Sequence, residues 1–178
     1  MIKLLILDVD GVMTDGRKYY DKEGNVKLKT FCDKDWTAIK RFKALGIKVI
    51  LLTGDPFNVV IGENRKLDVI VNRFSGEHRD KSSYLPGICE DYEVTPKEIC
   101  FIGDDIFDIG LLKLVGHAYC PKDSAREVRN VSKILSVNGG DNVVMHLFDS
   151  LRDSQIIPKI SFDEHLQDVY DLDILEKF

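Results

Sequence analysis

The chain has 178 residues, of which 44% are hydrophobic, and its 25 Lys and Arg against 30 Asp and Glu give a formal net charge of -5. This length and composition predict one folded domain with a substantial core, and they exclude an intrinsically disordered chain. The negative balance offers no general positive field for nucleic acid or an anionic membrane surface, so an anionic substrate must be held by a local site.

Two features of the sequence bear on the cellular compartment. The first apolar run ends at Asp8, which leaves it too short for a signal-peptide core, and no run reaches the roughly 18 residues that span a bilayer. The four cysteines form no C-x-x-C pair, and a chain of this length does not depend on disulfides. We therefore expect a cytoplasmic protein with reduced cysteines and with neither a membrane nor a nucleic-acid partner.

Short runs of Leu, Ile and Val alternate with helical patterns along the chain. The strong runs predict buried parallel strands at Leu4–Leu7, Val49–Leu52, Val69–Val71 and Ile99–Ile102, and weaker candidates are Tyr119–Cys120 and Ile134–Leu135. Helices are expected between Trp36 and Gly46 and over Phe107–Leu114. This alternation predicts an α/β fold, a Rossmann-like doubly wound parallel sheet with right-handed crossovers.

Two segments depart from the alternation. Residues 17–30 hold two β-prone arms around a polar turn that contains Gly24, which predicts a hairpin flap. A tail, residues 151–178, is expected to form a last helix near Phe162–Leu175, after Pro158. We expect residues 1–150 to form the main domain, with the flap as an insertion and no large cap.

Polar residues follow the predicted strands, where open α/β sheets bind their ligands. They are Asp8 and Asp10 after the first strand, Thr53 and Gly54 after the second, Lys81 in the loop after the third, and Asp104, Asp105 and Asp108 after the fourth. A single Asp at such a place is usually a turn residue or a helix cap, and a single Lys is usually a solvated surface residue. Arg79 is a rival to Lys81 as the cation of this loop.

Three of these carboxylates are expected to converge. Asp8 and Asp10 lie two apart, which places both side chains on one side of extended backbone, and Asp104 ends a strand expected beside the first. Like charges this close need a cation, and hard oxygen ligands suit Mg²⁺. Zinc is not expected, because the histidines at 78, 117, 146 and 165 show no ligand spacing.

The order and spacing of these motifs resemble the haloacid dehalogenase (HAD) superfamily of phosphatases. The motifs are Asp8-Val-Asp-Gly-Val12, Thr53-Gly54, Lys81 and Gly103-Asp-Asp-Ile-Phe-Asp108. Residues 1 to about 150 are most similar to the capless branch that contains 3-deoxy-D-manno-octulosonate 8-phosphate (KDO 8-phosphate) phosphatases. That likeness depends on Asp8–Gly16, on the hairpin end Lys29–Asp35 and on the Gly103–Asp108 motif.

The resemblance implies roles for the residues at the strand ends. Asp8 would be the nucleophile that forms an aspartyl-phosphate, and Asp10 the general acid and base. Mg²⁺ would be held by Asp8, by the main-chain carbonyl of Asp10 and by Asp104.

Further residues would surround the phosphate by the same resemblance. Thr53 and Gly54 would donate hydrogen bonds to the phosphoryl oxygens, and Lys81 would supply positive charge. Asp105 and Asp108 would lie around the metal or Lys81.

Three departures from the branch concern the substrate side. Asp55 stands where relatives have Arg, so a positive contact is lost, and Lys34-Asp35-Trp36 replaces Arg-Asp-Gly, which keeps the charge at Lys34 and adds bulk. Residues 139–146 replace a family segment that carries basic residues. In that branch the flap and tail of a neighbouring subunit are thought to close the site, which implies a homotetramer here.

The function predicted from these features is Mg²⁺-dependent hydrolysis of a sugar phosphate in carbohydrate biosynthesis, with KDO 8-phosphate as the leading substrate. One alternative keeps the chemistry and changes the substrate to a nine-carbon keto-deoxy acid phosphate or another phosphosugar. Another alternative is a non-catalytic oligomerisation module derived from a phosphatase. A nucleotide-binding Rossmann enzyme is disfavoured, because no G-x-G-x-x-G follows the first strand.

Overall fold

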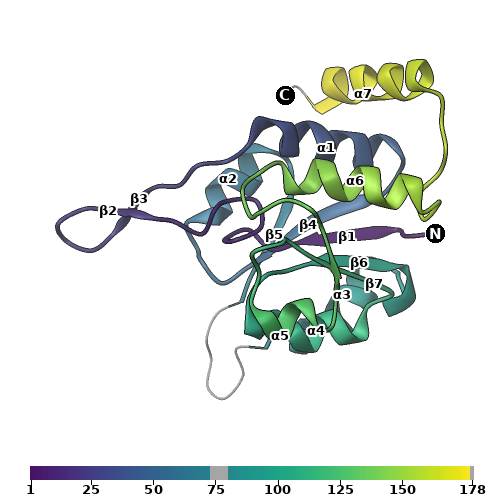
Figure 1. Cartoon of the computed structure of the whole chain (residues 1–178). Helices are drawn as coiled ribbons and strands as arrows, with labels where there is room; N and C mark the ends of the chain where they lie inside the picture. The colour runs from purple at the N-terminus through teal and green to yellow at the C-terminus, as the bar shows by residue number, and fades with distance from the viewer. Residues whose placement is uncertain (73–79, 177–178) are drawn as a thin grey trace.

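A six-stranded sheet, all parallel, forms the centre of the computed structural model, which describes residues 1–72 and 80–176 (Figure 1). The strand order is β5-β4-β1-β6-β7-β8. The bounds are β1 Leu4–Leu7, β4 Lys48–Thr53, β5 Asp68–Val71, β6 Ile99–Ile102, β7 His117–Cys120 and β8 Lys133–Ile134. The predicted doubly wound α/β fold is confirmed, and the weaker strand candidates fall in β7 and in the edge strand β8.

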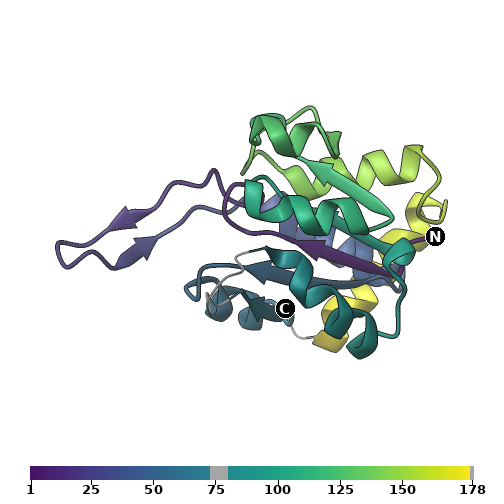
Figure 2. The ribbon, with the colours of Figure 1, turned by 90° about the horizontal axis from the view of Figure 1, so that it is seen from below.

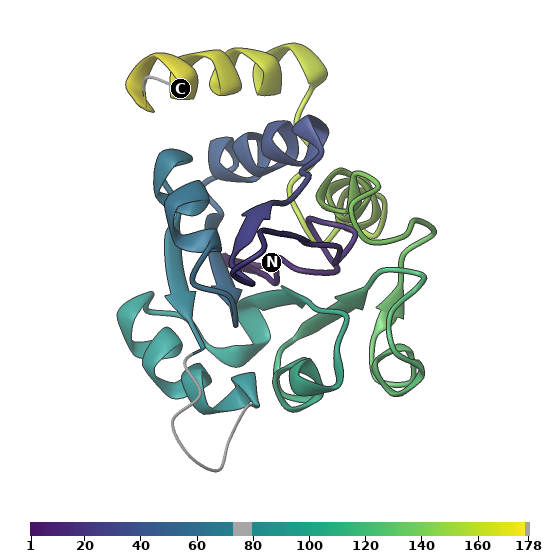
Figure 3. The ribbon, with the colours of Figure 1, turned by 90° about the vertical axis from the view of Figure 1, so that its left-hand side faces the viewer.

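Helices cover both faces of this sheet, with α1, α2 and α6 on one side and α3, α4 and α5 on the other (Figure 3). Their bounds are α1 Asp33–Ala44, α2 Asn58–Asn64, α3 Leu85–Asp91, α4 Ile109–Leu114, α5 Arg126–Arg129, α6 Val143–Asp153 and α7 Phe162–Glu176. Three short 3₁₀ turns are η1 Lys81–Tyr84, η2 Pro96–Glu98 and η3 Ile106–Asp108. In the described part of the chain, no helix combines the length and apolar character needed to cross a membrane.

The core consists of two apolar clusters, because the side chains of β1 alternate between the two faces of the sheet. Leu5 and Leu7 pack into the apolar cluster under α1 and α6, whereas Leu4 and Ile6 pack into the cluster on the opposite face. All four side chains have no exposed surface, as a central parallel strand requires. Trp36 is 6% exposed and belongs to the first cluster.

Most predicted element bounds differ from the observed ones by only a few residues. Helix α1 begins three residues before Trp36, and Gly46, with φ of +75°, follows its end. The segment expected as one helix after β6 is divided into η3 and α4, because Asp105 caps η3 through a hydrogen bond from the Ile106 N–H (2.6 Å).

The flap is a two-stranded antiparallel hairpin, β2 Tyr19–Tyr20 and β3 Val26–Leu28, as predicted. It projects away from the body of the molecule (Figure 2). Tyr19, Tyr20 and Leu28 are each more than 60% exposed, so the hairpin carries apolar surface that this chain does not cover.

The segment after residue 139 belongs to the body of the chain, which differs from the expectation of a tail that reaches a neighbouring subunit. A Cβ on Gly139 would overlap the Gly11 carbonyl oxygen, and the Gly140 N–H donates to the Val12 carbonyl (2.9 Å). Helix α6 then packs on α1, and its Val143, Val144 and Leu147 are fully buried. Deleting this segment would therefore remove part of the core.

Helix α7 forms the predicted last helix and lies across α1 (Figure 1). Lys40 pairs with Asp173 (2.7 Å), and Lys43 pairs with Glu176 (2.5 Å). His165 is 5% exposed and stacks on Phe148 at 5.6 Å between ring centroids, so it is part of the α6–α7 contact rather than a metal ligand.

A buried carboxylate joins α1 to α6. Asp35 is 1% exposed, and its Oδ1 accepts hydrogen bonds from the N–H groups of Val144 (2.8 Å) and Met145 (3.2 Å) at the start of α6. Burial raises the pKa of Asp35 to about 6, against the lowering effect of these N–H groups.

This pKa predicts how stability depends on pH. The pKa of Asp35 is about 6 in the folded chain and 3.8 for a free carboxyl group. Protonated Asp35 therefore stabilises the folded state fully below pH 3.8, and this stabilisation is lost as the pH rises through 6. From pH 7 to pH 5, the free energy of unfolding of the wild type should rise by about 1 kcal/mol relative to Asp35→Asn. Urea unfolding at both values measures this difference, and parallel curves for the two proteins would contradict it.

Candidate active site

The carboxyl ends of the central strands open into a cavity of about 720 Å³. Most of the polar residues predicted from the strand ends line it. Its walls are formed by Asp8, Asp10, Lys18, Gly54, Asp55, Pro56, Val71, Asn72, Lys81, Asp104, Asp105, Phe107 and Asp108.

Lys81 lies at the floor of this cavity between two carboxylates. Its Nζ is 2.8 Å from Asp8 Oδ2 and 2.7 Å from Asp108 Oδ1, and the residue is 5% exposed. Burial disfavours its charge, but Asp8 and Asp108 outweigh burial and raise the pKa of Lys81 above its usual value. Lys81 therefore remains a cation at neutral pH. Its rival Arg79, like His78, falls outside the described residues.

The charge of this group is not balanced by Lys81 alone. Oxygens of Asp8, Asp104 and Asp108 lie within 4.8 Å of one another, and the buried Asp104 Oδ1 has no hydrogen-bond partner. Burial raises the pKa of Asp8 to about 7, with a further increase from Asp108. Burial and the charges of Asp8 and Asp108 raise the pKa of Asp104 to about 8. Hard oxygen atoms in this arrangement fit a divalent cation such as Mg²⁺.

Glycines allow these carboxylates to approach the backbone. A Cβ on Gly11, whose φ is +87°, would overlap the Asp104 carboxylate. A Cβ on Gly103 would overlap Asp108, whose Oδ2 accepts hydrogen bonds from the N–H groups of Asp104 (2.9 Å) and Asp105 (3.0 Å). The spacing of the Gly103–Asp108 motif thus follows from the need to place two carboxylates around one turn.

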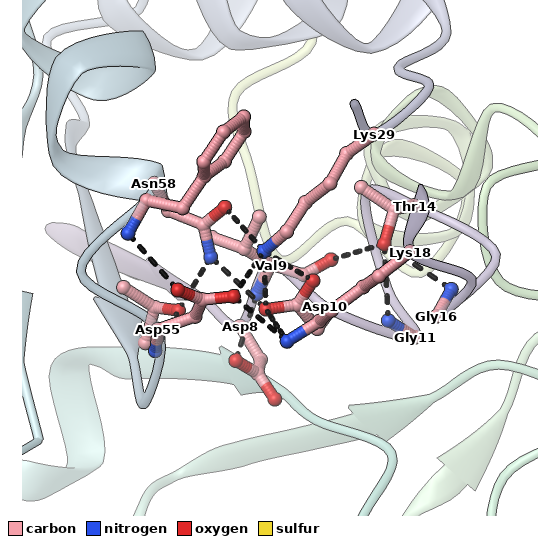
Figure 4. A network of polar contacts seen from close by, with 12 residues as sticks. Asp8, Val9, Asp10, Gly11, Thr14, Gly16, Lys18, Lys29, Asp55 and Asn58 are labelled. Carbon is pink, nitrogen blue, oxygen red and sulfur yellow. Dashed lines mark hydrogen bonds and ion pairs between the residues drawn. The ribbon is translucent and has the colours of Figure 1, made fainter. Parts of the chain in front are cut away.

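A second polar network lies beside the first and includes two lysines from the flap segment (Figure 4). Lys29 Nζ is 2.7 Å from Asp10 Oδ1 and 2.8 Å from Asp55 Oδ2, and Lys18 Nζ is 2.7 Å from Asp55 Oδ2. Asn58 Nδ2 donates to Asp10 Oδ2 at 3.1 Å. Burial opposes ionisation of Asp55, yet the two lysines hold its pKa well below the usual range. Asp55, which stands where the branch has Arg, is thus paired with two lysines from the base of the flap.

The remaining predicted residues take different positions. Thr53 has no exposed surface, and its hydroxyl accepts hydrogen bonds from Asn58 Nδ2 (2.7 Å) and the Asp55 N–H (3.2 Å). Lys34 is exposed on the first turn of α1 and is not among the residues of the cavity wall, because α1 turns the adjacent Asp35 inward. The Asp105 side chain is exposed at the rim. Asp108 lies against Lys81 (2.7 Å) and beside Asp8 and Asp104.

Three residues that sequence reasoning missed are Lys18, Lys29 and Asn58. Lys18 and Lys29 lie near the two ends of the predicted hairpin, where lysines are usually solvated. Asn58 begins α2, five residues after Thr53, and is fully buried. No spacing in a single sequence distinguishes such residues from ordinary surface residues. They become evident only in the fold, which places the base of the flap beside the end of β4.

The fold and this geometry agree with the comparison to known proteins. Residues 70–148 match the haloacid dehalogenase-like hydrolase family. The chain is thus similar to haloacid dehalogenase-like hydrolases over this segment. This confirms the resemblance that the strand-end motifs indicated.

Similar proteins over most of the chain support the same branch. A 3-deoxy-D-manno-octulosonate 8-phosphate phosphatase from Haemophilus influenzae is 29% identical over 155 residues, which are 86% of this chain and 84% of that protein. The solved cobalt-bound form of the Haemophilus influenzae phosphatase has 26% identity and a TM-score of 0.78 over 86% of this chain and 89% of that one. The Moraxella catarrhalis phosphatase, solved with magnesium, phosphate and KDO, has 25% identity and a TM-score of 0.74 over 87% and 91%.

The raised pKa values predict that a divalent cation binds with release of protons. Near pH 7, Asp8 and Asp104 are partly protonated without a cation, and a bound cation requires their ionised forms. Calorimetry of Mg²⁺ binding in buffers of different ionisation enthalpy should show release of about one proton at pH 7 and tighter binding at pH 8 than at pH 6. Asp104→Asn should release fewer protons. Equal heats in all buffers would contradict the prediction.

Proposed function

We propose that this hydrolase is a Mg²⁺-dependent phosphatase that cleaves the phosphomonoester of a 3-deoxy-2-keto sugar acid, with KDO 8-phosphate as the leading substrate. The observation that carries the proposal is the buried Asp8, paired with Lys81 and close to Asp104, at the floor of an open cavity. The similar proteins from Haemophilus influenzae and Moraxella catarrhalis are 3-deoxy-D-manno-octulosonate 8-phosphate phosphatases, which supports the substrate class.

The metal in this proposal is held by Asp8 and Asp104, with Asp108 close by. The Asp10 carboxylate is engaged by Lys29 and Asn58, so a contact from Asp10 would use its main-chain oxygen. When bound, Mg²⁺ neutralises phosphate charge and lets a carboxylate approach an anion. Cobalt in one relative's structure and magnesium in another's support a divalent ion, and the oxygen donors of this chain favour Mg²⁺.

The reaction takes place in two steps. In the first, a carboxylate oxygen of Asp8 attacks phosphorus, the bond from phosphorus to the ester oxygen breaks, and Asp10 gives its proton to the departing alcohol. In the second, Asp10 takes a proton from water, which attacks phosphorus, breaks the bond to Asp8 and releases inorganic phosphate. Asp10 is then protonated again, so it serves as acid and base in turn.

Other residues of the chain stabilise the phosphoryl group during transfer. Lys81, which stays charged between Asp8 and Asp108, supplies positive charge beside the attacking carboxylate. We propose that the Gly54 N–H and the Thr53 hydroxyl donate hydrogen bonds to phosphoryl oxygens. The Thr53 hydroxyl would donate its own hydrogen, because its oxygen already accepts a hydrogen bond from Asn58. An intact set of charged groups disfavours the alternative of a non-catalytic module.

The cavity wall beyond the phosphate supports a polar leaving group. Lys18, Asp55 and Asn72 present donors and acceptors there, and Phe107 and Val71 add apolar surface. A volume of about 720 Å³ is in the range of small-molecule sites and accommodates a sugar acid. A nine-carbon keto-deoxy acid phosphate or another phosphosugar remains the alternative, because Asp55 and residues 139–146 depart from the branch pattern.

We also propose that the protein assembles as a homotetramer through its flap. The exposed Tyr19, Tyr20 and Leu28 lie on a two-stranded hairpin, which is unstable alone in water and needs a packing partner. Closed symmetry provides such partners from further copies of the chain.

The four cysteines are all free thiols, in keeping with the proposed cytoplasmic location.

Phosphate release from KDO 8-phosphate and from a panel of other phosphosugars tests the function. Wild type should release phosphate with Mg²⁺ and not with EDTA. Asp8→Asn should lose at least about 10³-fold in kcat, because an amide cannot attack phosphorus. Its thermal unfolding should match the wild type, since the substitution removes one of several like charges. Turnover by Asp8→Asn at the wild-type rate would exclude the covalent mechanism.

Sedimentation tests the assembly. The wild type should sediment as a tetramer, and Tyr19→Ser with Tyr20→Ser should shift it to smaller species, because it removes apolar surface from the proposed contact. Tyr170→Ser is the matched control, since Tyr170 on α7 is 54% exposed, close to the 61% of Tyr19 and Tyr20. A monomeric wild type would contradict the proposal.

A further inference from the structure

Lys29 is a charged flap residue whose side chain is fully buried next to the proposed acid and base. It follows β3 directly, and its side chain has no exposed surface. Its Nζ contacts both oxygens of Asp10 (2.7 and 2.9 Å), Asp55 Oδ2 (2.8 Å) and Asn58 Oδ1 (2.9 Å). The Phe57 ring lies 5.3 Å from the same nitrogen.

These contacts leave Lys29 no hydrogen for a substrate. An ammonium has three N–H donors, and three residues already occupy them. Lys18 differs, because its side chain is 24% exposed, it lines the cavity, and its short contact is with Asp55 alone. A direct role in binding or chemistry is therefore open to Lys18 and closed to Lys29.

Asp10 depends on few other groups for its orientation. Asn58 Nδ2 donates to Asp10 Oδ2 at 3.1 Å, and Lys18 Nζ lies farther off at 3.7 Å. Asp10 follows the end of β1 in a turn, so no strand hydrogen bonds fix its position. Without Lys29, only the hydrogen bond from Asn58 and the long ion pair with Lys18 would hold the Asp10 carboxylate. As the proposed acid, this carboxylate must reach the leaving oxygen.

We infer that Lys29 is a positioning residue that holds Asp10 against the leaving group, so that the base of the flap helps to complete the acid and base of the reaction. The inference rests on the proposed function. Proton transfer needs placement of the acid to within about 0.5 Å, and small displacements of a catalytic group cost about 10²-fold in rate. The base of the flap thus acts on the chemistry of the reaction.

A purely structural role for Lys29 makes a different prediction. If Lys29 only fastened the flap, its loss would slow cleavage of all phosphate esters alike. A misplaced acid instead slows the esters whose leaving alcohols need a proton, and spares those with good leaving groups. The dependence on the leaving group therefore separates the two roles.

The test compares Lys29→Met with the control Lys27→Met. Lys27 is on the same flap, is 63% exposed, and pairs with Asp21 inside the hairpin (3.2 Å). The first phosphoryl transfer is measured with Mg²⁺ by rapid quench, using KDO 8-phosphate as alkyl ester and p-nitrophenyl phosphate as aryl ester. Mannose 6-phosphate replaces KDO 8-phosphate if wild type does not cleave the latter.

Lys29→Met should lose about 10²-fold or more on the alkyl ester and less than about tenfold on the aryl ester. Lys27→Met should match wild type on both, and calorimetry should find Mg²⁺ affinity unchanged in all three proteins. If Lys29→Met does not fold, Lys29→Gln, which keeps an N–H donor at shorter reach, should show the same leaving-group dependence.

Equal losses on the two esters, or no loss on either, would overturn the role of Lys29 and leave the phosphatase intact. Failure of wild type to cleave any of the esters with Mg²⁺ would be seen before any variant is made. That result would overturn the proposed function itself.

Discussion

The mutual repulsion of buried carboxylates is the constraint on which the rest of the site depends. Asp8, Asp104 and Asp108 are brought within 4.8 Å of one another by strand ends and a tight turn, and only Lys81 among the described residues lies directly between two of them. One ammonium cannot balance three such groups, as the raised pKa values of Asp8 and Asp104 indicate. The fold therefore holds an arrangement that a cation completes, and the tightly packed core of apolar strands beneath it supplies the rigidity.

The central sheet and the residues at its carboxyl edge could be predicted from the sequence because both depend on local pattern. A strand buried on both faces must be a short continuous apolar run, and Leu4–Leu7 and Ile99–Ile102 match the observed strands exactly in their bounds. The first polar residues after such runs lie at one edge of a parallel sheet by geometry alone. The sequence alone therefore predicts that Asp8 and Asp104 lie close together.

Contacts between segments distant in the sequence could not be predicted in this way. Lys18 and Lys29 lie at the base of a hairpin whose own sequence does not show what surrounds that base. They contact Asp10 and Asp55 only because the base of the flap lies beside the loop after β4. Helix α6, in contrast, has a local signal that the sequence analysis did not use, because its buried residues recur at helical spacing. Local propensity describes an element, whereas its partners are a property of the assembled chain.

The packing of Gly139 against Gly11 links an early and a late segment of the chain in time as well as in space. Gly139 and Gly140 contact the loop that follows Asp8, and α6 covers α1 behind that loop. On a ribosome, Asp8 is synthesised long before Gly139 and Gly140, which pack on its loop. A nascent chain thus cannot complete the packing around Asp8 until the segment from Gly139 through α6 has emerged.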